Sequence, residues 1–584
     1  MNASPSPNPA TVWAGAVAEA LAGAGVQHVC LAPGSRSTPL VLAFAAHPVL
    51  RIWRHLDERS AAYFALGIGQ ATNRPAALLA TSGTATANFF PAVVEARMAG
   101  VPLLVITADR PPELRHSGAN QTIDQVKLYG DQVLWSVDLP LPEAEAPELA
   151  LRNLKALVAR AAATAGGLAP GPVHLNAPFR KPFEPLDEQP AAREEPAAPA
   201  LQITRGQLLP TEAQATLLGS MVADNPRGII VVGPRRKQND GFAEAVTTLA
   251  RYAGYPIFAD PLSGLRFGPW VAETAVLGGY ETYLMADEPG WAEPELVLRF
   301  GAVPTSSALN AYLERIRPKH RIHVRESGVW ADDSHRTTLF LQAGETATCG
   351  AILAKMGARR RPWGWAAQLQ ATEGLYWQVM RKSMADSEFD GAYVVDLMRL
   401  LPANSRLFVG SSLPIRHVDQ FARPRARPLY VYANRGASGI DGNTSSALGV
   451  AAATGDPVIL LAGDITFYHD MNGLLAVRQH GLKLISVVLN NGGGNIFRRL
   501  PVSRIDPPFT ELFVTPHGLE FGPVAELYGL AYTRVESRPA FREALRAALA
   551  ADEPALVEVC TDGRADHERR QELLASVLAE VRGR

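Results

Sequence analysis

Short apolar runs alternate with helix-length segments along almost the whole chain, and this alternation constrains the fold more than any other feature of the sequence. Apolar runs of about four to eight residues, rich in aliphatic and β-branched side chains, are typical of strands that are buried on both faces. Strands that alternate with helices indicate βαβ units, in which neighbouring strands run parallel. The pattern therefore predicts an α/β fold built from parallel sheets.

The strand candidates occur in three groups along the chain. The first group is Val26–Ala32, Ala76–Thr81 and Pro102–Ala108. The second group is Gly228–Gly233, Pro256–Ala259, Leu296–Gly301 and Arg321–Val324. The third group is Leu407–Gly410, Leu429–Ala433, Pro457–Ala462, Leu484–Asn490 and Ala555–Cys560. Helical patterns such as Ala61–Ala71 and Ala87–Ala99 lie between them.

Two stretches interrupt this pattern and divide the chain into three parts. Residues 181–200 are rich in Pro, Glu and Ala, which is typical of a linker, and residues 357–364 (GARRRPWG) form a weaker break. At roughly 100–200 residues per domain, the length alone corresponds to about three or four domains. We therefore expect three α/β domains over residues 10–180, 200–356 and 365–584.

Charge and composition exclude several classes of protein. The 56 Lys and Arg residues nearly balance the 57 Asp and Glu residues, which argues against a nucleic-acid partner, although a local basic patch remains compatible with this balance. No apolar run approaches the roughly 20 residues of a membrane span, and the first ten residues lack the features of a signal peptide. The three cysteines (Cys30, Cys349, Cys560) are far apart, which indicates free thiols and a cytoplasmic protein.

The sharpest chemical pattern lies in the third part, where polar residues follow two successive strands. Gly463 and Asp464 follow the strand Pro457–Ala462, and Asn491, 27 residues after Asp464, follows the next strand and opens a Gly-rich loop. One crossover of this length places both strand ends at the same edge of a sheet. Carboxylate and amide oxygens suit Mg²⁺, and the Gly-rich backbone suits a phosphate. Two turns capped by Asp and Asn are the alternative.

Arginines also follow several of the predicted strands. They are Arg36, Arg110, Arg416 and Arg435. Ligands of open parallel sheets bind beyond the carboxyl ends of the strands, and guanidinium groups recognise carboxylates. If the four arginines converge, the substrates carry several carboxylates; four ordinary surface ion pairs are the alternative. Glu58, which opens an apolar helix, is either a solvated first-turn glutamate or a buried acid, and the residues alone leave both open.

Eight motifs, in order from residue 33 to residue 497, resemble one known family. They are PGSRS at 33–37, DER at 57–59, TSGTATAN at 81–88, TADRPPEL at 107–114, GANQ at 118–121, NRGASGIDG at 434–442, HDMNGL at 469–474 and NNGGGNIF at 490–497. Together with Gly463-Asp464 they resemble the 2-succinyl-5-enolpyruvyl-6-hydroxy-3-cyclohexene-1-carboxylate synthases. This family lies within the thiamine diphosphate-dependent, pyruvate-oxidase-like superfamily. The resemblance implies pyrimidine-binding, middle and diphosphate-binding domains, in that order.

The resemblance also implies site residues. By position, Glu58 is the catalytic acid that bonds the aminopyrimidine ring, and Asp464, Asn491 and the carbonyl of Gly493 are ligands of Mg²⁺, with Mn²⁺ as a substitute. Further expected cofactor contacts are Ile440, Gly463, Ile465 and Ile496. The expected substrate contacts are Ser35, Arg36, Arg110, Gln121, Ser412, Arg416, Arg435 and Phe497.

The implied reaction has two halves and belongs to menaquinone biosynthesis. 2-Oxoglutarate is decarboxylated on thiamine diphosphate, which acts as the electron sink, and the four-carbon product then adds to isochorismate in a 1,4-fashion. The resemblance further implies a homodimer or tetramer in which the cofactor lies between two chains. The family often has a basic residue after the strand that ends at Gly301, whereas residues 302–308 contain neither Lys nor Arg, so a contact of the middle domain with isochorismate stays open.

Three other interpretations remain to be weighed. Another thiamine diphosphate enzyme, such as a 2-oxoacid decarboxylase or an acetohydroxyacid synthase, would share the cofactor motif but not the GSRS, ADRPPEL and NRGASGIDG segments. A non-catalytic binding subunit on the same fold would not need Glu58, Asp464 and Asn491, which are all present. A nucleotide site at residues 232–236 lacks the GxGxxG pattern, so a plain strand end is the better interpretation there.

Overall fold

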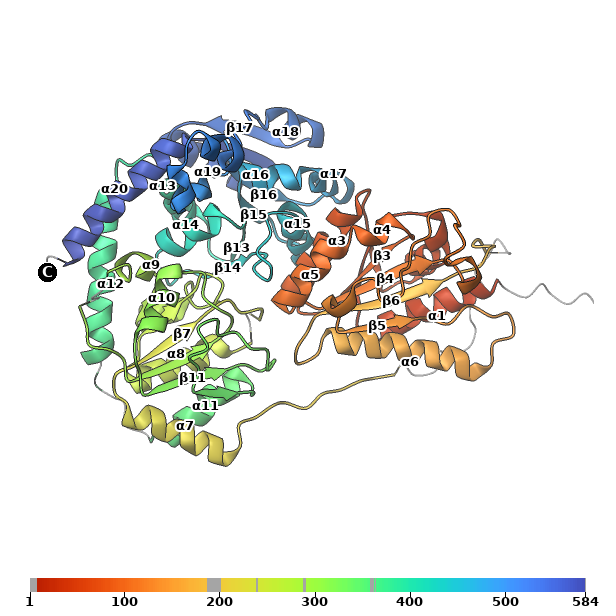
Figure 1. The fold of residues 1–584 in the computed structure, drawn as a ribbon, viewed down its shortest axis with the longest axis horizontal. Helices are drawn as coiled ribbons and strands as arrows, with labels where there is room; N and C mark the ends of the chain where they lie inside the picture. The colour runs from red at the N-terminus through yellow and green to blue at the C-terminus, as the bar shows by residue number, and fades with distance from the viewer. Residues whose placement is uncertain are drawn as a thin grey trace, which may run out of the picture. The chain divides into compact units, whose positions relative to one another are not determined.

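The computed structural model describes residues 8–185, 201–237, 240–286, 290–357, 362 and 364–582. Within them, three six-stranded sheets occur, and neighbouring strands in each sheet run parallel (Figure 1). The predicted parallel α/β fold is confirmed. Parts of the predicted tail, linker and second break lie outside the described residues, namely 1–7, 186–200, 358–361 and 363.

The first sheet has the strand order β2-β1-β3-β4-β6-β5. Its strands are β1 (His28–Leu31), β2 (Arg51–Arg54), β3 (Ala76–Ala80), β4 (Leu103–Asp109), β5 (Trp135–Asp138) and β6 (Pro172–Pro178). Its helices are α1 (Pro9–Gly23), α2 (Thr38–Ala46), α3 (Glu58–Thr72), α4 (Thr84–Ala87), α5 (Phe90–Ala99) and α6 (Glu148–Ala165).

The second sheet has the order β12-β11-β10-β7-β8-β9. Its strands are β7 (Gly228–Val232), β8 (Ile257–Ala259), β9 (Val276–Leu277), β10 (Leu296–Phe300), β11 (His320–Val324) and β12 (Leu339–Leu341). The helices in this part of the chain are α7 (Glu212–Asp224), α8 (Phe242–Ala253), α9 (Tyr280–Tyr283), α10 (Ser307–Arg315) and α11 (Glu345–Lys355).

The third sheet has the order β14-β13-β15-β16-β18-β17. Its strands are β13 (Ser405–Val409), β14 (Leu429–Tyr432), β15 (Val458–Gly463), β16 (Leu484–Asn490), β17 (Ala531–Val535) and β18 (Ala555–Cys560). The helices of this part are α12 (Gly364–Ser383), α13 (Asp390–Leu400), α14 (Leu413–Phe421), α15 (Asn443–Thr454), α16 (Asp464–His469), α17 (Leu475–His480), α18 (Gly522–Tyr528), α19 (Arg538–Ala550) and α20 (Gly563–Arg582).

Backbone contacts group the chain into two compact units. The first unit contains residues 1–205, 434–456 and 469–483, and the second contains residues 206–433, 457–468 and 484–584. Helices α15 and α17 of the third part therefore belong to the first unit, where α15 packs closely on α3. A Cβ atom at Gly67 would lie 2.0 Å from the carbonyl oxygen of Ser446, and one at Gly449 would lie 2.1 Å from that of Phe64. Only glycine permits so close a crossing of the two helix backbones.

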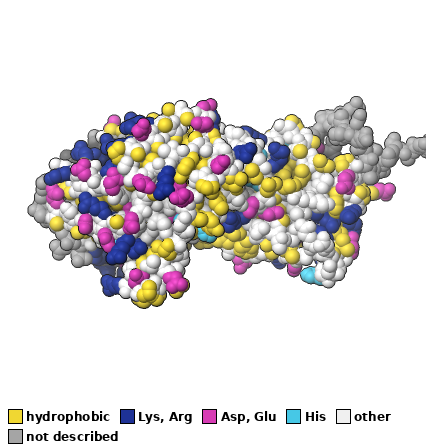
Figure 2. Space-filling model, turned by 90° about the horizontal axis from the view of Figure 1, so that it is seen from above, with side chains coloured by type: hydrophobic (Ala, Val, Ile, Leu, Met, Phe, Trp, Pro, Cys, Tyr) yellow, Lys and Arg dark blue, Asp and Glu magenta, His cyan; other side chains and the backbone are white. Residues whose placement is uncertain are grey.

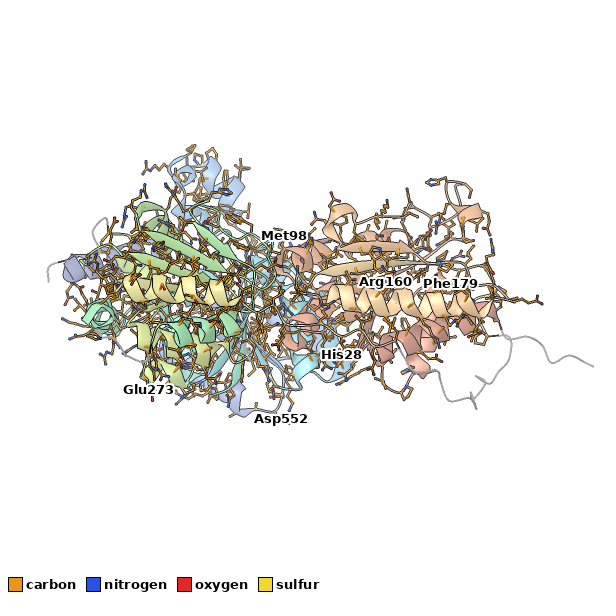
Figure 3. The ribbon with its side chains drawn as sticks, turned by 90° about the horizontal axis from the view of Figure 1, so that it is seen from below. His28, Met98, Arg160, Phe179, Glu273 and Asp552 are labelled. Carbon is orange, nitrogen blue, oxygen red and sulfur yellow. The ribbon has the colours of Figure 1, made fainter. Side chains whose placement is uncertain are left out.

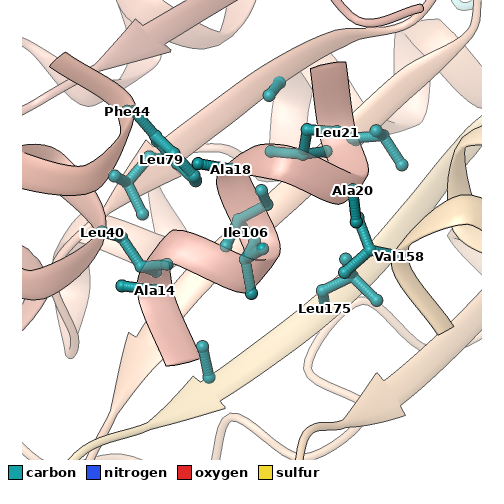
Figure 4. Close-up of a cluster of buried hydrophobic side chains, with 14 of the residues drawn as sticks. Ala14, Ala18, Ala20, Leu21, Leu40, Phe44, Leu79, Ile106, Val158 and Leu175 are labelled. Carbon is teal, nitrogen blue, oxygen red and sulfur yellow. The ribbon is translucent and has the colours of Figure 1, made fainter. Parts of the chain in front are cut away.

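Strands β3 and β4 of the first sheet are buried on both faces, which explains their largely apolar sequences. One face packs on α1, α2 and α6 through the side chains in Figure 4, which include Leu79 of β3, Ile106 of β4 and Leu175 of β6. Alternate strand residues point away from this cluster, as expected for a pleated strand. Residues such as Leu78 and Val105, both fully buried, belong to the opposite face.

Surface charge and thiols agree with the expectations from composition. On the face shown in Figure 2, Lys and Arg side chains are interspersed with Asp and Glu side chains. Cys30 and Cys349 are buried free thiols, and Cys560 is a partly buried free thiol. Among the described helices, none combines the length and the hydropathy that a membrane crossing requires.

Candidate active site

Ser35 and Arg36 lie in a short helical turn, Ser35–Ser37, that directly follows β1 in the first unit. The Arg36 side chain is buried, and its Nη1 donates to the carbonyl oxygen of Phe179 at 2.7 Å. Phe179, labelled in Figure 3, follows β6, which lies in the same sheet as β1. The guanidinium group is therefore fixed beyond the carboxyl ends of the strands, where the sequence predicts a ligand.

Arg110, which follows β4, joins the same group of polar side chains. Its guanidinium donates to Ser82 Oγ and to the carbonyl oxygen of Asn120, and Gln121 Nε2 donates to the carbonyl oxygen of Ser82 at 3.0 Å. Burial, together with the charge of Arg110, lowers the pKa of Arg36. An anion placed between the two guanidinium groups would offset their mutual repulsion. The structure thus brings together three predicted substrate residues, Arg36, Arg110 and Gln121.

Glu58 is the first residue of α3. The preceding Asp57 caps the helix, because its Oδ1 accepts from the backbone N–H of Ser60 at 2.9 Å. Glu58 itself is only partly buried, whereas the family resemblance leads us to expect a buried acid. Its place at the start of the helix explains the difference, since the continuous buried stretch of α3 begins only at Ser60.

The loop 434–442, which carries Arg435 and Ile440, is held by a residue that the sequence does not single out. The carboxylate of Glu95, on α5, accepts three successive backbone N–H groups, those of Gly436 at 2.6 Å, Ala437 at 2.7 Å and Ser438 at 3.3 Å. Burial raises the pKa of Glu95, and the three N–H donors oppose this shift. An acidic residue inside the otherwise apolar segment FFPAVVEA is the sequence signal that could have found it.

Close packing fixes the same loop at two further points. A Cβ atom at Gly436 would lie 2.5 Å from the backbone nitrogen of Ala99 on α5, so a larger residue does not fit there. At the other end of the loop, the hydroxyl of Tyr63 donates to Asp441 Oδ2 at 2.7 Å. Arg435 and Ile440 therefore sit on a loop that is anchored to α5 and α3.

Replacement of Glu95 by alanine is expected to destabilise the first unit. It removes three part-buried hydrogen bonds from backbone N–H groups to a carboxylate, and one such bond to a charged group contributes about 1.5–3 kcal/mol. Glu95→Gln retains an acceptor oxygen and should have a smaller effect. Urea unfolding measures both, with Met98→Ala as the matched control, since Met98 is exposed on the same helix (Figure 3). A Glu95→Ala protein as stable as Met98→Ala would contradict the anchoring role.

Asp464 and Gly493 meet at adjacent strand ends in the second unit, where Gly463 of β15 pairs with Leu489 of β16. The Asp464 carboxylate is 3 % exposed. Its Oδ1 accepts from the N–H of Ile465 at 2.7 Å, and its Oδ2 accepts from the N–H of Gly493 at 2.9 Å. Burial raises the pKa of Asp464, which indicates a carboxylate with too little positive charge around it.

The Asn491 side chain is fixed by two residues that the sequence does not single out. Its Nδ2 donates to Asp390 Oδ2 at 2.8 Å, and its Oδ1 accepts from Asn495 Nδ2 at 2.9 Å. Asp390 is held in turn by Thr561, whose hydroxyl donates to Asp390 Oδ1 at 2.8 Å. The orientation of the Asn491 amide is therefore set by neighbours on α13 and on the turn after β16.

The remaining predicted residues of the second unit follow β13 and β16. Ser412 precedes α14 with an unusual φ of 75°, and Arg416, on the first turn of that helix, donates from Nη1 to the carbonyl oxygen of Ser412 at 2.8 Å. Ile496 and Phe497 lie in the 3₁₀ turn Asn495–Arg499, and both are partly buried.

Comparison with known proteins assigns this arrangement to a family. Residues 13–128 match the N-terminal TPP binding domain of thiamine pyrophosphate enzymes, residues 212–409 their middle domain, and residues 416–559 their C-terminal TPP binding domain. A 2-succinyl-5-enolpyruvyl-6-hydroxy-3-cyclohexene-1-carboxylate synthase from Roseiflexus sp. is 51 % identical over 98 % of this chain and 99 % of its own length. Synthases of the same name from Halobacterium salinarum and Geobacillus kaustophilus are 45 % and 44 % identical, each over 97 % of this chain and 98 % of its own length.

The chain belongs to this synthase family. The predicted family, the superfamily fold and the requirement for thiamine diphosphate are thereby confirmed. The first and third sheets of the synthase each lie largely within a matched TPP binding domain, and the second lies within the matched middle domain. The predicted domain boundaries and the roles of the individual site residues remain predictions.

The residues of the synthase at β15 and β16 fit a divalent cation beside a diphosphate. Asp464 is a buried carboxylate that has no Lys or Arg nitrogen within 4.0 Å among the described residues, and the imidazole of His517 lies beside it, with Nε2 3.2 Å from Oδ2. Cβ atoms built at Gly463 and Gly492 meet no atom within 4 Å, so there is open space beside this carboxylate. Oxygen donors of this kind suit Mg²⁺ and Mn²⁺.

The predicted residues of the synthase fall into two sets, one in each unit. The first set is Ser35, Arg36, Glu58, Arg110, Gln121, Arg435 and Ile440. The second set is Ser412, Arg416, Gly463, Asp464, Ile465, Asn491, Gly493, Ile496 and Phe497. Within the first set, Arg36 and Arg110 are electrostatic neighbours, and within the second set Asp464 and Gly493 are directly hydrogen-bonded.

Proposed function

We propose that the protein is a thiamine diphosphate-dependent synthase that decarboxylates 2-oxoglutarate and adds the resulting succinyl group to isochorismate. The product is 2-succinyl-5-enolpyruvyl-6-hydroxy-3-cyclohexene-1-carboxylate, a precursor of menaquinone. The observation that carries this proposal is the 51 % identity over 98 % of the chain to a synthase of that name. The presence of Glu58, Asp464 and Asn491 supports a catalytic protein over a binding subunit.

Thiamine diphosphate, when bound, supplies the carbon nucleophile and the electron sink for decarboxylation. Asp464, Asn491 and the carbonyl oxygen of Gly493 hold a Mg²⁺ or Mn²⁺ ion for the diphosphate, and the burial of Asp464 supports this role. Gly463 and Ile465 flank that carboxylate, and Ile440 and Ile496 provide apolar contacts for the cofactor. Glu58 holds a proton at the aminopyrimidine ring nitrogen, the role its position in the DER motif implies.

The arginines bind the carboxylates of the two substrates. Arg36 and Arg110 form one cationic group, which Gln121 and Ser35 extend with neutral polar atoms. Arg416 and Ser412 at the start of α14, and Arg435 on the loop anchored by Glu95, supply the others, with Phe497 as an apolar wall. Guanidinium groups suit this task because they offer two parallel donors to a carboxylate.

The assembly is a homodimer or tetramer in this proposal, and the protein acts in the cytoplasm, where its three free thiols stay reduced. Size-exclusion chromatography with light scattering measures the assembly. A monomer that is fully active would contradict this part of the proposal.

Incubation with thiamine diphosphate, Mg²⁺, 2-oxoglutarate and isochorismate tests the proposed reaction. We expect CO₂ release coupled to consumption of isochorismate, with the product identified by mass spectrometry. Turnover of pyruvate without any consumption of isochorismate would assign the chain to another thiamine diphosphate activity. Absence of Mg²⁺-dependent cofactor binding would support a non-catalytic subunit.

Arg416→Ala and Arg435→Ala are each expected to weaken use of a carboxylate substrate. Loss of one partner of a buried charge-assisted contact costs about 2–5 kcal/mol, which corresponds to a fall in kcat/KM of at least about thirtyfold. Steady-state kinetics with each substrate varied in turn shows which carboxylate each arginine serves. The matched control is Arg504→Ala, an exposed arginine of the second unit. Unchanged kinetics in both variants would remove the two residues from the site.

A further inference from the structure

A small pocket in the second unit lies between α14, α20 and the turn Asn495–Arg499. Its polar lining groups are His417 on α14, Asn495 and Arg499 on the turn, and Asp566 and Arg570 on α20. Asn495 connects the pocket to the candidate metal site, because its Nδ2 also donates to Asn491. None of these five residues belongs to the proposed substrate or cofactor contacts.

The two arginines of the pocket, Arg570 buried and Arg499 partly buried, form no ion pair with a carboxylate among the described residues. Arg499 Nη2 has no hydrogen-bond partner and is shielded from solvent. Arg570 donates from Nε and Nη2 only to the neutral oxygen Gln420 Oε1, at 3.2 and 2.7 Å. Among the described residues, no carboxylate oxygen lies within 4.0 Å of either guanidinium group. An unpaired buried cation is costly, and arginine cannot lose its charge by deprotonation.

The described neighbouring acids form no direct ion pair with the two arginines. Burial and the neighbouring Asp390 raise the pKa of Asp566, which reduces its charge near neutral pH. Burial and the charges of Arg570 and Arg416 lower the pKa of Arg499 to about 9, which indicates net repulsion among the cations. Glu281 is the other acid that faces these arginines, and its charge acts on both of them, but its carboxylate accepts from Ser306 Oγ at 2.6 Å and forms no direct ion pair with either guanidinium group among the described residues.

His417 is a further buried polar side chain of the pocket to which no protein group is hydrogen-bonded among the described residues. Its side chain is 1 % exposed, and neither Nδ1 nor Nε2 has a hydrogen-bond partner. Burial and three nearby arginines lower its pKa well below the usual value, so the ring is neutral and one nitrogen carries a proton to donate. Buried polar groups in native proteins are almost always satisfied, by protein, water or ligand.

A metal cation is the rival occupant. Ligand atoms of Asp390, His417 and Asp566 lie within 4.8 Å of one another, a donor set that could bind a divalent ion. Such an ion would, however, be repelled by Arg499 and Arg570, which line the same pocket. The two guanidinium groups, neither of which has a direct ion-pair partner among the described residues, favour an anion instead.

We propose that this pocket is a binding site for a small oxyanion, a carboxylate or phosphate group, held by the guanidinium groups of Arg499 and Arg570. His417 and Asn495 complete the site with neutral donors. The site goes beyond the proposed function, because its occupant need not be either substrate of the synthase. Carboxylate and phosphate share the geometry that a guanidinium fork recognises, so the probes must distinguish them.

The test uses the full chain saturated with thiamine diphosphate and Mg²⁺, so that the diphosphate site is already filled. Melting temperature is measured against inorganic phosphate, acetate and succinate, with chloride at equal ionic strength as the reference. A saturable rise in melting temperature with phosphate alone identifies a phosphate site, and a rise with acetate or succinate identifies a carboxylate site. We expect Arg499→Gln to raise the midpoint concentration about tenfold or more, whereas Arg504→Gln on the nearby exposed loop leaves it unchanged.

A second measurement separates a ligand site from an ordinary structural contact. Because Arg499 is a partly buried charge without a direct ion-pair partner among the described residues, Arg499→Gln in chloride alone should be at least as stable as the wild type. A marked loss of stability in chloride would mean that Arg499 is already paired, and would overturn the proposal. So would stabilisation by Zn²⁺ with no response to any of the three oxyanions, or an identical oxyanion response in Arg499→Gln and the wild type.

Discussion

Glu58→Gln is expected to abolish most of the activity while leaving a folded protein that still binds its cofactor. The substitution preserves the size of the side chain but removes the acid that the proposed function places at the aminopyrimidine ring. Positioned acids and bases contribute about 10²–10⁴-fold to rate, so kcat should fall by about that factor. Exchange of the thiazolium C2 proton of the bound cofactor, followed by NMR, measures the effect without turnover.

Glu148→Gln is the matched control for this variant. Glu148 is the first residue of α6, as Glu58 is of α3, so both substitutions remove a carboxylate from the first turn of a helix. Both should therefore cost the same small amount of helix stability, about 0.3–1 kcal/mol. A Glu58→Gln protein with the proton exchange rate and the kcat of Glu148→Gln would remove Glu58 from catalysis.

Asp464→Asn is expected to remove metal-dependent cofactor binding. Asp464 is the one charged group of the proposed metal site, and even residues that only support a metal ligand contribute 10–100-fold to affinity, so we expect a loss of about 100-fold or more. Titration of the apo protein with thiamine diphosphate at several Mg²⁺ concentrations measures it, by quenching of protein fluorescence. The same titration with Mn²⁺ should show a parallel loss.

The folded state of the Asp464→Asn protein should be preserved. Burial raises the pKa of Asp464, so its charged form is disfavoured in the absence of a cation, and a neutral amide of the same size should be tolerated. Asp456→Asn, an exposed residue that precedes β15 at the other end of the strand, is the control. A wild-type Mg²⁺ midpoint in Asp464→Asn would contradict the ligand role.

Interior strands of the three sheets are evident from the sequence, and edge strands mostly are not. β15, with the sequence VILLAG, is buried on both faces and reads as a continuous apolar run. By contrast, β17 (AYTRV) and β2 (RIWR) lie at sheet edges, carry exposed Arg residues, and were not predicted. An edge strand lacks a neighbour on one side and is less completely covered, so its sequence needs less apolar character.

β6 is an interior strand that the sequence does not reveal, and its polar residues explain why. His174 and Asn176 are buried in the middle of it, with His174 Nε2 2.8 Å from Thr107 Oγ1 and Asn176 Nδ2 donating to Asp109 Oδ2 at 2.9 Å. Each polar group is satisfied by a neighbour on β4, so the burial of polar side chains is tolerated. These hydrogen bonds form only when β4 and β6 lie side by side in the sheet, so the sequence of β6 alone shows no strand pattern.

In the candidate site, too, some contacts between residues close in the sequence can be predicted, and contacts between distant residues cannot. The sequence predicts that Asp464 and Asn491 converge, because a single crossover fixes the relation between two adjacent strand ends; in the structure the direct contact of Asp464 is with the N–H of Gly493 in the same loop, and the Asn491 amide bonds Asp390. Glu95 was not predicted, because its partners lie more than 340 residues away in the chain. The sequence does not reveal Asp390 either, since its role appears only when α13 meets Asn491. Asn495 is close to Asn491 in the chain, but nothing in the NNGGGNIF pattern singles out its side chain as the partner.

Glu95 hydrogen-bonds to backbone atoms of the loop 434–442 rather than to its side chains, and this has a consequence for protein engineering. The Glu95 carboxylate accepts only from backbone N–H groups, so this contact places no constraint on the side chain at position 437. Ala437 is also exposed. Position 436 must remain glycine for lack of space, and Ser438, with φ 63°, favours residues such as Asn or Gly. Different side chains can therefore be introduced at position 437, close to Arg435, without a change in the backbone conformation of the loop.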